Sequence, residues 1–460
     1  MTPGGRLSAA IDILEILEAP DAPPADKVLA DWARGNRYAG SKDRQAIATM
    51  VYGVLRRRGQ IDWWLERTRG VDPGHPPAAR DRLLVWLQLG EGWRLTDLEK
   101  ACDGARFAPE PLRMREKRVA IELTSQRGFD FGCQPVAARA NAPEWLAARF
   151  ADIHGERADA EASAYLEEAP VDLRVNTLKA DRAAAKAALA EEGLVAVETP
   201  YSPVGLRLAG RAPLSGTRAF KQGLVEPQDE GSQLAALLTD ARPGQRVVDF
   251  CAGAGGKSLA LAARMNNTGR LVACDTSENR LKRAAQRLKR AGVFIVERRP
   301  LTSERDKWVK RAASAKGGKG SLYDRVLIDA PCTGTGTWRR NPDQKWKTTE
   351  ADLERLIEIQ GQILDSAARL VAPGGRLVYV TCSWLAEENE ARVAAFLAER
   401  PDFFAYPIAD VWAETVAAQQ GTAQDGGACP APAGATSLRL SPGAQGVDGF
   451  FVAVMGRKLA

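Results

Sequence analysis

Two cysteines, Cys332 and Cys382, each lie just past an apolar run that is typical of a buried strand. Asp329 precedes Cys332 by three positions, so a carboxylate accompanies the first thiol. Open α/β sheets bind ligands beyond the carboxyl ends of their strands, and we expect all three side chains there. A single cysteine of this kind is more often a small core residue. Two of them at neighbouring strand ends favour catalysis.

Two thiols and a carboxylate in one site suit the methylation of a pyrimidine ring. Carbon 5 of cytosine is a poor nucleophile, and addition of a thiolate to carbon 6 activates it by splitting one hard step into easier ones. A carboxyl group would contact ring nitrogen 3 and the exocyclic amine. A base would then remove the proton from carbon 5 so that the thiolate can leave, and no metal is required. The spacing does not decide which of Cys332 and Cys382 attacks.

A glycine-rich loop follows another strand-like run, in Asp249–Ser258 (DFCAGAGGKS). Such a loop lets a ligand approach the backbone at a helix N-terminus. Ser258 occupies the third glycine position of a dinucleotide site, and Cys251 occupies the first glycine position of a phosphate-binding loop. S-adenosylmethionine has no phosphate and does not need that loop. Asp275, at the end of the next predicted strand, would accept its ribose hydroxyls.

Composition narrows the class of protein. The 460 residues suggest two or three domains, and 45% hydrophobic and 27% charged residues are typical of a globular chain. The seven cysteines are scattered without a CxxC pair, which argues against a zinc knuckle or a disulfide framework. The two histidines are His75 and His154, so the C-terminal half works without imidazole. Ser–His–Asp hydrolases and most zinc hydrolases are therefore excluded.

The N-terminal apolar stretch is not a signal peptide, because Asp12, Glu15 and Glu18 interrupt it. The sequence also contains no run of the roughly 18 apolar residues that a membrane helix needs. We therefore expect a cytoplasmic protein without a membrane partner. We also expect it to be a monomer.

The pattern of apolar residues predicts three parts. Residues 1–140 show helical spacing and form an all-helical domain, 141–230 form a small α+β subdomain, and 231–460 alternate strands with helices. The buried, β-branched strands of the last part predict an α/β domain, with an open, mostly parallel, Rossmann-like sheet between two layers of helices. Val293–Val296 is predicted as its third strand, followed by a basic loop, 297–319.

The basic residues cluster, although the net charge is only +6. Residues 280–290 hold six Lys or Arg and no acid, and further basic groups lie in 297–319 and Arg339–Lys347. A solvated helix face explains one such run as well as a phosphate contact does, and several together favour nucleic acid. Arg174 and Asn176 alternate with apolar residues in VDLRVN, so we expect them to point away from the core, toward RNA or water.

Several motifs resemble those of the Sun-type (Fmu) RNA cytosine-5 methyltransferases. They are D-x-C-A-x-x-G-G-K-S (249–258), D-A-P-C (329–332), R-N-P-D-x-K-W (340–346), Y-x-T-C-S (379–383) and E-E-N-E (387–390). The likeness covers roughly residues 170–458, and the paired PC and TC motifs are very specific. Arg37–Arg57 resembles the NusB-like RNA-binding helical domain. This extends the likeness to the branch of the family that modifies 16S ribosomal RNA.

The resemblance implies a class I methyltransferase domain that uses S-adenosylmethionine. Carried over, Cys382 is the nucleophile, Cys332 assists product release and Asp329 contacts the base. The predicted cofactor-binding residues are Cys251, Ala252, Gly253, Ala254, Gly255, Gly256, Lys257, Asp275 and Asp329. The predicted RNA contacts are Arg174, Asn176, Arg339, Arg340 and Lys345. Trp338 or Trp346 would stack on bases or, equally, pack in the core.

Two positions depart from the family pattern. The usual Ala-Pro of the glycine loop is Gly253-Ala254 here, which loosens the loop. The family also places an aspartate after the third strand, near the adenine, where this chain has Glu297-Arg298-Arg299-Pro300. Glu297 is the candidate replacement.

These observations predict an S-adenosylmethionine-dependent RNA (cytosine-5) methyltransferase that acts on RNA and not on DNA. The expected substrate is 16S ribosomal RNA, which places the protein in rRNA processing. The alternatives are a transfer RNA methyltransferase of the same chemistry and an RNA-binding assembly factor with an inactive site. Titration with S-adenosylmethionine separates an enzyme from such a factor.

Overall fold

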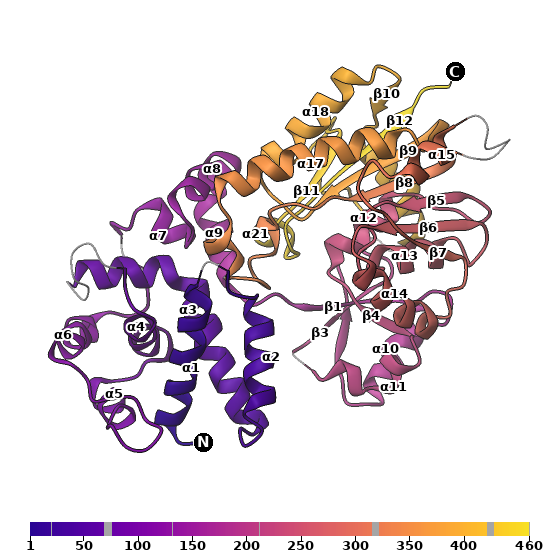
Figure 1. Cartoon of the computed structure of the whole chain (residues 1–460). Coiled ribbons are helices and arrows are strands. Elements are labelled where there is room, and N and C mark those ends of the chain that lie inside the picture. Colours follow the sequence, from indigo (N-terminus) through magenta and orange to yellow (C-terminus); the bar gives the residue numbers. More distant parts are fainter. Residues whose placement is uncertain are drawn as a thin grey trace. The chain divides into compact units, whose positions relative to one another are not determined.

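A computed structural model describes residues 1–19, 21–68, 76–130, 132–210, 212–314, 322–420 and 427–459. His75 and part of the basic segment 297–319 lie outside the described residues. The chain forms two compact units, residues 1–168 with 337–348 and residues 169–336 with 349–460 (Figure 1). The first unit extends past the predicted boundary at 140, because the helices between 144 and 166 pack with those before them.

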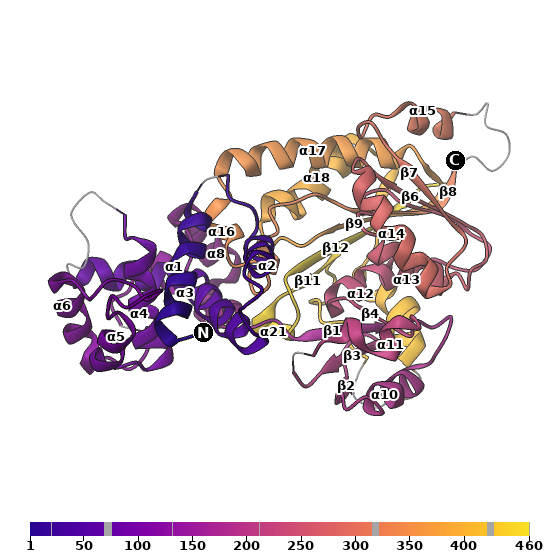
Figure 2. The same cartoon turned by 60° about the horizontal axis from the view of Figure 1, so that its bottom comes forward.

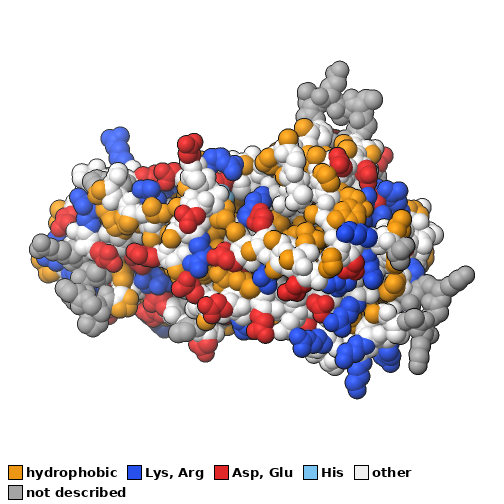
Figure 3. All heavy atoms as spheres, turned by 90° about the horizontal axis from the view of Figure 1, so that it is seen from above, with side chains coloured by type: hydrophobic (Ala, Val, Ile, Leu, Met, Phe, Trp, Pro, Cys, Tyr) orange, Lys and Arg blue, Asp and Glu red, His pale blue; other side chains and the backbone are white. Residues whose placement is uncertain are grey.

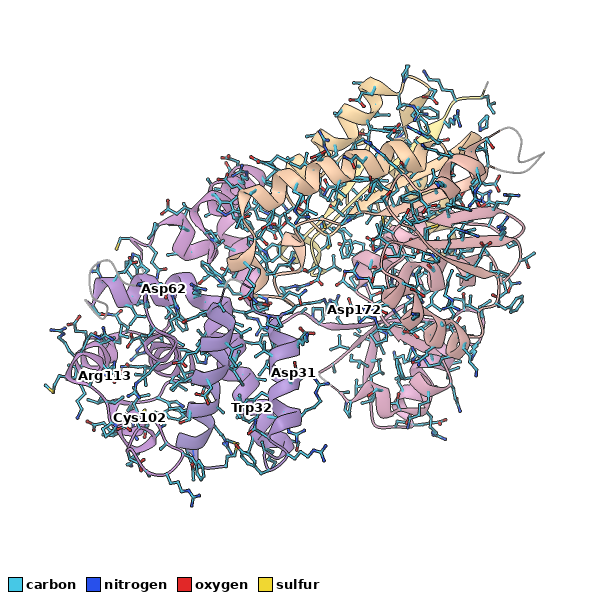
Figure 4. The ribbon with its side chains drawn as sticks, viewed as in Figure 1. Asp31, Trp32, Asp62, Cys102, Arg113 and Asp172 are labelled. Carbon is cyan, nitrogen blue, oxygen red and sulfur yellow. The ribbon has the colours of Figure 1, made fainter. Side chains whose placement is uncertain are left out.

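The first unit is helical, as predicted. Its helices are α1 (Pro3–Glu18), α2 (Ala25–Gly35), α3 (Ser41–Arg67), α4 (Ala79–Glu91), α5 (Leu95–Ala101), α6 (Met114–Glu122), α7 (Val136–Ala140), α8 (Glu144–His154), α9 (Ala158–Leu166) and α16 (Gln344–Lys347). Apolar side chains of α1, α3 and α4 meet in its core. Asp62 of α3 accepts a hydrogen bond from Arg82 of α4 at 2.7 Å, and Cys102 is buried just past α5 (Figure 4).

The second unit begins with a small antiparallel sheet in the order β2-β3-β1-β4. These strands are β1 (Val171–Val175), β2 (Ala196–Glu198), β3 (Gly205–Leu208) and β4 (Val225–Pro227). Leu173 and Val175 of β1 pack against Ala185 and Leu189 of α10 (Arg182–Ala190). Together these elements form a small α+β subdomain that precedes the main sheet in the sequence.

Within the described residues the main sheet has eight strands, in the order β10-β12-β9-β8-β5-β6-β7 with β11 paired to β12. They are β5 (Arg246–Asp249), β6 (Arg270–Asp275), β7 (Val296–Pro300), β8 (Tyr323–Asp329), β9 (Val371–Thr381), β10 (Phe403–Ala405), β11 (Ser437–Leu440) and β12 (Phe450–Arg457). β5 to β9 are parallel, and β12 is antiparallel to β9. The prediction of an open, mostly parallel sheet is confirmed.

Helices cover both faces of this sheet (Figures 1 and 2). The core on one face includes α12 (Glu230–Leu238), α13 (Gly256–Arg264), α14 (Glu278–Ala291) and α19 (Ile408–Trp412). The core on the other includes α15 (Lys307–Ala313), α17 (Glu350–Ala368) and α18 (Glu390–Glu399). Consecutive residues of β5 divide between them, because Val247 faces the first layer and Val248 the second. The strand order reverses at β5, so the ligand crevice is expected at the carboxyl ends of β5 and its neighbours.

The third parallel strand is β7, and the prediction of Val293–Val296 is wrong. β7 is the edge of the sheet and pairs with β6, so its side chains can reach water and its sequence, VERRP, gives no apolar signal. Glu297 therefore lies within the strand, opposite Val272, and not beyond its end.

Among the described residues no helix has both the length and the apolar character that a membrane crossing requires.

Candidate active site

A cavity of about 370 Å³ opens at the carboxyl ends of β5, β6, β7 and β8. Three acids line it, namely Asp275 at the end of β6, Glu304 beyond β7 and Asp329 at the end of β8. Phe250, Leu301 and the α17 residue Ile359 contribute an apolar wall. This lining suits a small molecule that has both an apolar ring and polar or cationic groups.

Sequence reasoning missed Glu304 and selected Glu297. The Glu297 carboxylate accepts hydrogen bonds from Arg270 at 2.6 Å and from Arg299 at 2.5 Å, and it does not line the cavity. Glu304 comes four residues after the last residue of β7. Because the third strand was predicted at Val293–Val296, the acid that follows its true end was not recognised.

The glycine loop has the backbone geometry that its composition indicates. Gly253 (φ +55°) and Gly255 (φ +79°) are both in the left-handed region, which side chains disfavour. The carboxylate of Asp275 accepts from the Gly253 amide at 2.8 Å and from the Ser277 amide at 2.7 Å. Asp275 therefore fixes the loop as well as lining the cavity.

The expectation that Arg174 and Asn176 point away from the core is wrong, because each is only 4% exposed. Arg174 donates to the carbonyl oxygen of Gly256 at 2.7 Å, and Asn176 donates to those of Gly223 and Ala291 at 2.8 Å each. Burial lowers the pKa of Arg174 to about 10. Alternation failed as a guide because β1 is covered on both faces. These side chains position the backbone and are not available to RNA.

Arg287, from the basic run 280–290, also holds the glycine loop. It donates to the carbonyl oxygen of Ala254 at 2.9 Å and forms an ion pair with buried Glu226 at 3.2 Å. Arg174 and Arg287 thus fix two carbonyls of the glycine loop, and one of them belongs to Ala254, which stands where the family pattern has proline. The exposed members of the run are Arg280, Lys282, Arg283 and Lys289. On the face drawn in Figure 3, Lys and Arg side chains gather most densely at the lower right.

Lys257 and Asp329 form an ion pair at the edge of the cavity. Their Nζ and Oδ2 atoms are 2.7 Å apart, and Lys257 is buried while Asp329 is partly exposed. The Lys257 ammonium also lies 5.5 Å from the centre of the Phe450 ring. Lys257 therefore orients the Asp329 carboxylate while leaving part of it accessible.

The two cysteines predicted for catalysis meet at the ends of β8 and β9, which are adjacent and parallel. The Sγ atoms of Cys332 and Cys382 are 3.5 Å apart, and both residues are partly exposed. The contact with Cys382, together with burial, raises the pKa of the Cys332 thiol. The structure therefore brings Cys332, Cys382 and Asp329 into one region, as the sequence predicts.

Glu388 and Asn389, from the E-E-N-E motif, hold both cysteine loops and are fully buried. The Glu388 carboxylate accepts from the Thr333 amide at 2.9 Å, next to Cys332. Asn389 donates to the carbonyl oxygen of Ser383 at 2.8 Å, next to Cys382. No catalytic role was predicted for this motif from the sequence. Its two side chains bind the backbone next to each cysteine and so help to hold the two thiols together.

The segment 337–348 belongs to the helical unit and is largely buried there. Arg339 is 4% and Lys345 1% exposed, so the prediction that they contact RNA is wrong. Lys345 donates to the carbonyl oxygen of Arg56 at 3.2 Å, beside the kink that α3 makes at Arg57. Burial lowers the pKa of Lys345 to about 7. Of the three basic residues predicted here, Arg340 alone is exposed.

Trp338 packs in the core of the helical unit, which decides between the two roles predicted for it. It is 1% exposed and its ring lies 6.4 Å from that of Phe150 in a stacked arrangement. Trp346 is partly buried and donates to the carbonyl oxygen of Leu55 at 3.2 Å.

Asp249, the last residue of β5, should make the stability of the protein depend on pH. One of its oxygens accepts from the Ser258 hydroxyl at 2.6 Å, and the other has no hydrogen-bond partner among the described residues. Burial and the nearby Asp329 raise the pKa of Asp249 to about 7. Between these two pKa values the Asp249 carboxyl is protonated in the folded state and ionised in the unfolded state, where its pKa is about 3.9. Stability from this proton is present at low pH and is lost as pH rises through about 7.

We expect Asp249→Asn to remove this pH dependence. Between roughly pH 4 and 7 the unfolding free energy of the wild type should fall, relative to the variant, by up to about 1.4 kcal/mol per pH unit. Denaturant titrations of both proteins across that range measure the difference. Parallel curves would contradict the assignment.

Comparisons with known proteins agree with this architecture. The family model described as 16S rRNA methyltransferase RsmB/F matches residues 236–456, and a ferredoxin-like domain of RsmF/B-like methyltransferases matches residues 142–215. The "probable ribosomal RNA small subunit methyltransferase B" of Bacillus subtilis is 30% identical over 433 residues, 91% of each chain. The "ribosomal RNA small subunit methyltransferase B" of Xylella fastidiosa is 32% identical over 419 residues, 90% of this chain and 91% of the other.

Solved structures are similar over long stretches. The crystal structure of PH0851 matches with a TM-score of 0.72 at 27% identity, over 99% of both chains. A methyltransferase homologue from Pyrococcus horikoshii matches with a TM-score of 0.55 at 27% identity, over 70% of this chain and 97% of the other.

Proposed function

Because the chain belongs to the RsmB/F family of 16S rRNA methyltransferases, we propose that it methylates carbon 5 of a cytosine in 16S ribosomal RNA. The observation that carries the proposal is the pair of thiols, Cys332 and Cys382, whose sulfurs are 3.5 Å apart. They follow adjacent strands, and Asp329, at the end of one of them, lines the cavity. Methylation of an exocyclic nitrogen or a ribose hydroxyl would give no role to two such thiols.

The cavity fits S-adenosylmethionine, which supplies an electrophilic methyl group when bound. Its acidic residues suit ribose hydroxyls and an ammonium group, and its apolar wall suits an adenine ring. The residues that would hold the molecule are Cys251, Ala252, Gly253, Ala254, Gly255, Gly256, Lys257, Asp275, Glu304 and Asp329. Within the described residues no group of three or more His, Cys, Asp or Glu side chains could hold a metal ion.

The proposed reaction gives a role to Cys382, Cys332, Asp329 and Lys257. The Cys382 thiolate forms a bond to carbon 6 of the cytosine, and Asp329, oriented by Lys257, contacts ring nitrogen 3 and the exocyclic amine. Carbon 5 then takes the methyl group and loses its proton to a base, after which the bond to Cys382 breaks. Cys332 assists this elimination. The assignment of attack to Cys382 follows the family resemblance.

The RNA contacts are reassigned to side chains that can reach a phosphate. Arg340 and the exposed α14 residues Lys282, Arg283 and Lys289 are proposed, and the buried residues Arg174, Asn176, Arg339 and Lys345 are not. The target base must leave its helix or come from a single strand to reach the thiols. We also propose that the helical unit serves as the NusB-like RNA-binding domain.

We expect Glu304→Gln to weaken S-adenosylmethionine binding roughly tenfold, because a carboxylate that accepts a hydrogen bond from the ligand is lost. Glu297→Gln is the matched control and should leave the affinity unchanged, since Glu297 is engaged by Arg270 and Arg299 outside the cavity. Calorimetric titration measures both. Equal affinities for the two variants would rule out the role of Glu304.

The function is tested with the purified protein, S-adenosylmethionine and unmodified 16S ribosomal RNA or transfer RNA, followed by bisulfite sequencing. The expected product is a single 5-methylcytosine in the ribosomal RNA. A methyl group on any other atom would overturn the chemistry, and modification of transfer RNA alone would overturn the substrate. A folded protein that binds no S-adenosylmethionine would instead be an RNA-binding factor.

A further inference from the structure

The two catalytic thiols are close enough to react with each other. Their sulfurs are 3.5 Å apart, and a disulfide brings them to about 2.05 Å. Both residues are partly exposed, so a small oxidant can reach them. Cys102 and Cys274 are buried instead, and Cys133 is exposed on the other compact unit.

The backbone on both sides of this contact is fixed. The carbonyl of Pro331 accepts from Gln360 at 2.9 Å, and Ala330 donates to the carbonyl of Val380 at 2.9 Å. Asn389 holds the loop after β9 through the carbonyl of Ser383. The strand ends therefore hold the two thiols next to each other, and disulfide formation has to shorten their separation from 3.5 Å to about 2.05 Å.

We propose that Cys332 and Cys382 form a reversible disulfide on exposure to a peroxide, and that this modification switches methyl transfer off. The loss of activity rests on the proposed function, because Cys382 can attack a base only as a free thiolate. The disulfide itself is a chemical event that can be measured separately.

Cys382 reacts first. Its thiolate attacks an oxygen of hydrogen peroxide, the O–O bond breaks, hydroxide leaves and a sulfenic acid remains on Cys382. The sulfur of Cys332 then attacks the Cys382 sulfur, the S–O bond breaks, and the departing hydroxide takes the Cys332 proton and leaves as water. Two thiols have lost two electrons and the peroxide has gained them. The raised pKa of the Cys332 thiol lowers its thiolate fraction, and the thiolate is the form that attacks peroxide.

This reaction would protect the active site. A sulfenic acid without a neighbouring thiol is oxidised further to sulfinic acid, which simple thiols do not reverse. With Cys332 3.5 Å away, the sulfenic acid is captured as a disulfide, which a dithiol reductant opens again. The second thiol thus serves both the elimination step and recovery from oxidation.

The test treats the full chain with hydrogen peroxide and follows intact mass, non-reducing peptide maps and methyl transfer together. We expect a mass loss of about 2 Da and a link between the peptides that contain Cys332 and Cys382. Activity should fall by at least about tenfold, and it should fall at the same rate as the link forms. Dithiothreitol should restore all three. Loss of activity with added oxygen mass and without the linked peptides would overturn the proposal.

Two variants sharpen the result. Cys133→Ser removes an exposed thiol far in sequence from the site and should behave like the wild type. Cys332→Ser should give no linked peptide, and its Cys382 peptide should gain oxygen mass that dithiothreitol does not remove. A protein that forms the link but transfers no methyl group even when fully reduced would overturn the switch and the proposed function together. Methyl transfer by a protein that never forms the link would overturn the switch alone.

Discussion

Replacing Cys382 with alanine is expected to abolish methyl transfer to RNA, with a loss of at least about 10³-fold in rate. In the proposed mechanism the sulfur adds to carbon 6 of the base, and without that bond carbon 5 stays too weak a nucleophile to take the methyl group. The loop should keep its shape, because Asn389 holds the Thr381 hydroxyl at 2.5 Å and the Ser383 carbonyl at 2.8 Å on either side. Transfer of labelled methyl groups to unmodified 16S ribosomal RNA measures the effect.

Two controls separate lost chemistry from lost structure. The affinity of Cys382→Ala for S-adenosylmethionine should match that of the wild type, because Cys382 does not line the cavity. Cys133→Ala removes an exposed thiol from the helical unit and should keep full activity. Activity of Cys382→Ala within about tenfold of the wild type would show that another residue attacks the base.

The main sheet and its site could be predicted because their signals are local. The parallel strands β5, β6, β8 and β9 are largely buried on both faces, so they appear as short apolar runs, and the residues that end them must meet at one edge. Asp275, Asp329, Cys332 and Cys382 were found in this way. The position of β7 was not predicted, because an edge strand tolerates charged residues and lacks an apolar run. Glu304, which follows β7 and lines the cavity, was missed for the same reason.

Four of the five predicted RNA contacts, all except Arg340, are buried, because burial depends on which distant segments pack together. Arg174 follows the alternation of an exposed strand residue, yet its guanidinium is needed at the carbonyl of Gly256, 82 positions away. Lys345 lies in a basic stretch, yet its ammonium meets the carbonyl of Arg56, 289 positions away. A basic residue in a sequence fits a phosphate or a buried carbonyl equally well. Only the three-dimensional structure distinguishes them.

Replacing Cys332 with alanine is expected to stall the enzyme after methyl transfer, with Cys382 still bonded to the base. In the proposed mechanism the elimination step loses its assisting thiol, while attack by Cys382 remains intact. A covalent complex of protein and RNA should therefore persist on a denaturing gel, and multiple-turnover methylation should fall by at least about 100-fold. A single turnover should still place close to one labelled methyl group on each trapped RNA.

The double variant, Cys332→Ala with Cys382→Ala, provides the matched control, because a complex that depends on Cys382 must disappear in it. Since the sulfurs are only 3.5 Å apart, geometry allows either thiol to reach carbon 6 of the base, and these experiments separate the two. If Cys332→Ala loses all methylation while Cys382→Ala accumulates the complex, the roles are exchanged. If both single variants lose methylation without a trapped complex, the assignment of Cys332 to the release step is wrong. A stalled Cys332→Ala complex together with an inactive Cys382→Ala is the one pattern that assigns attack to Cys382 and release to Cys332.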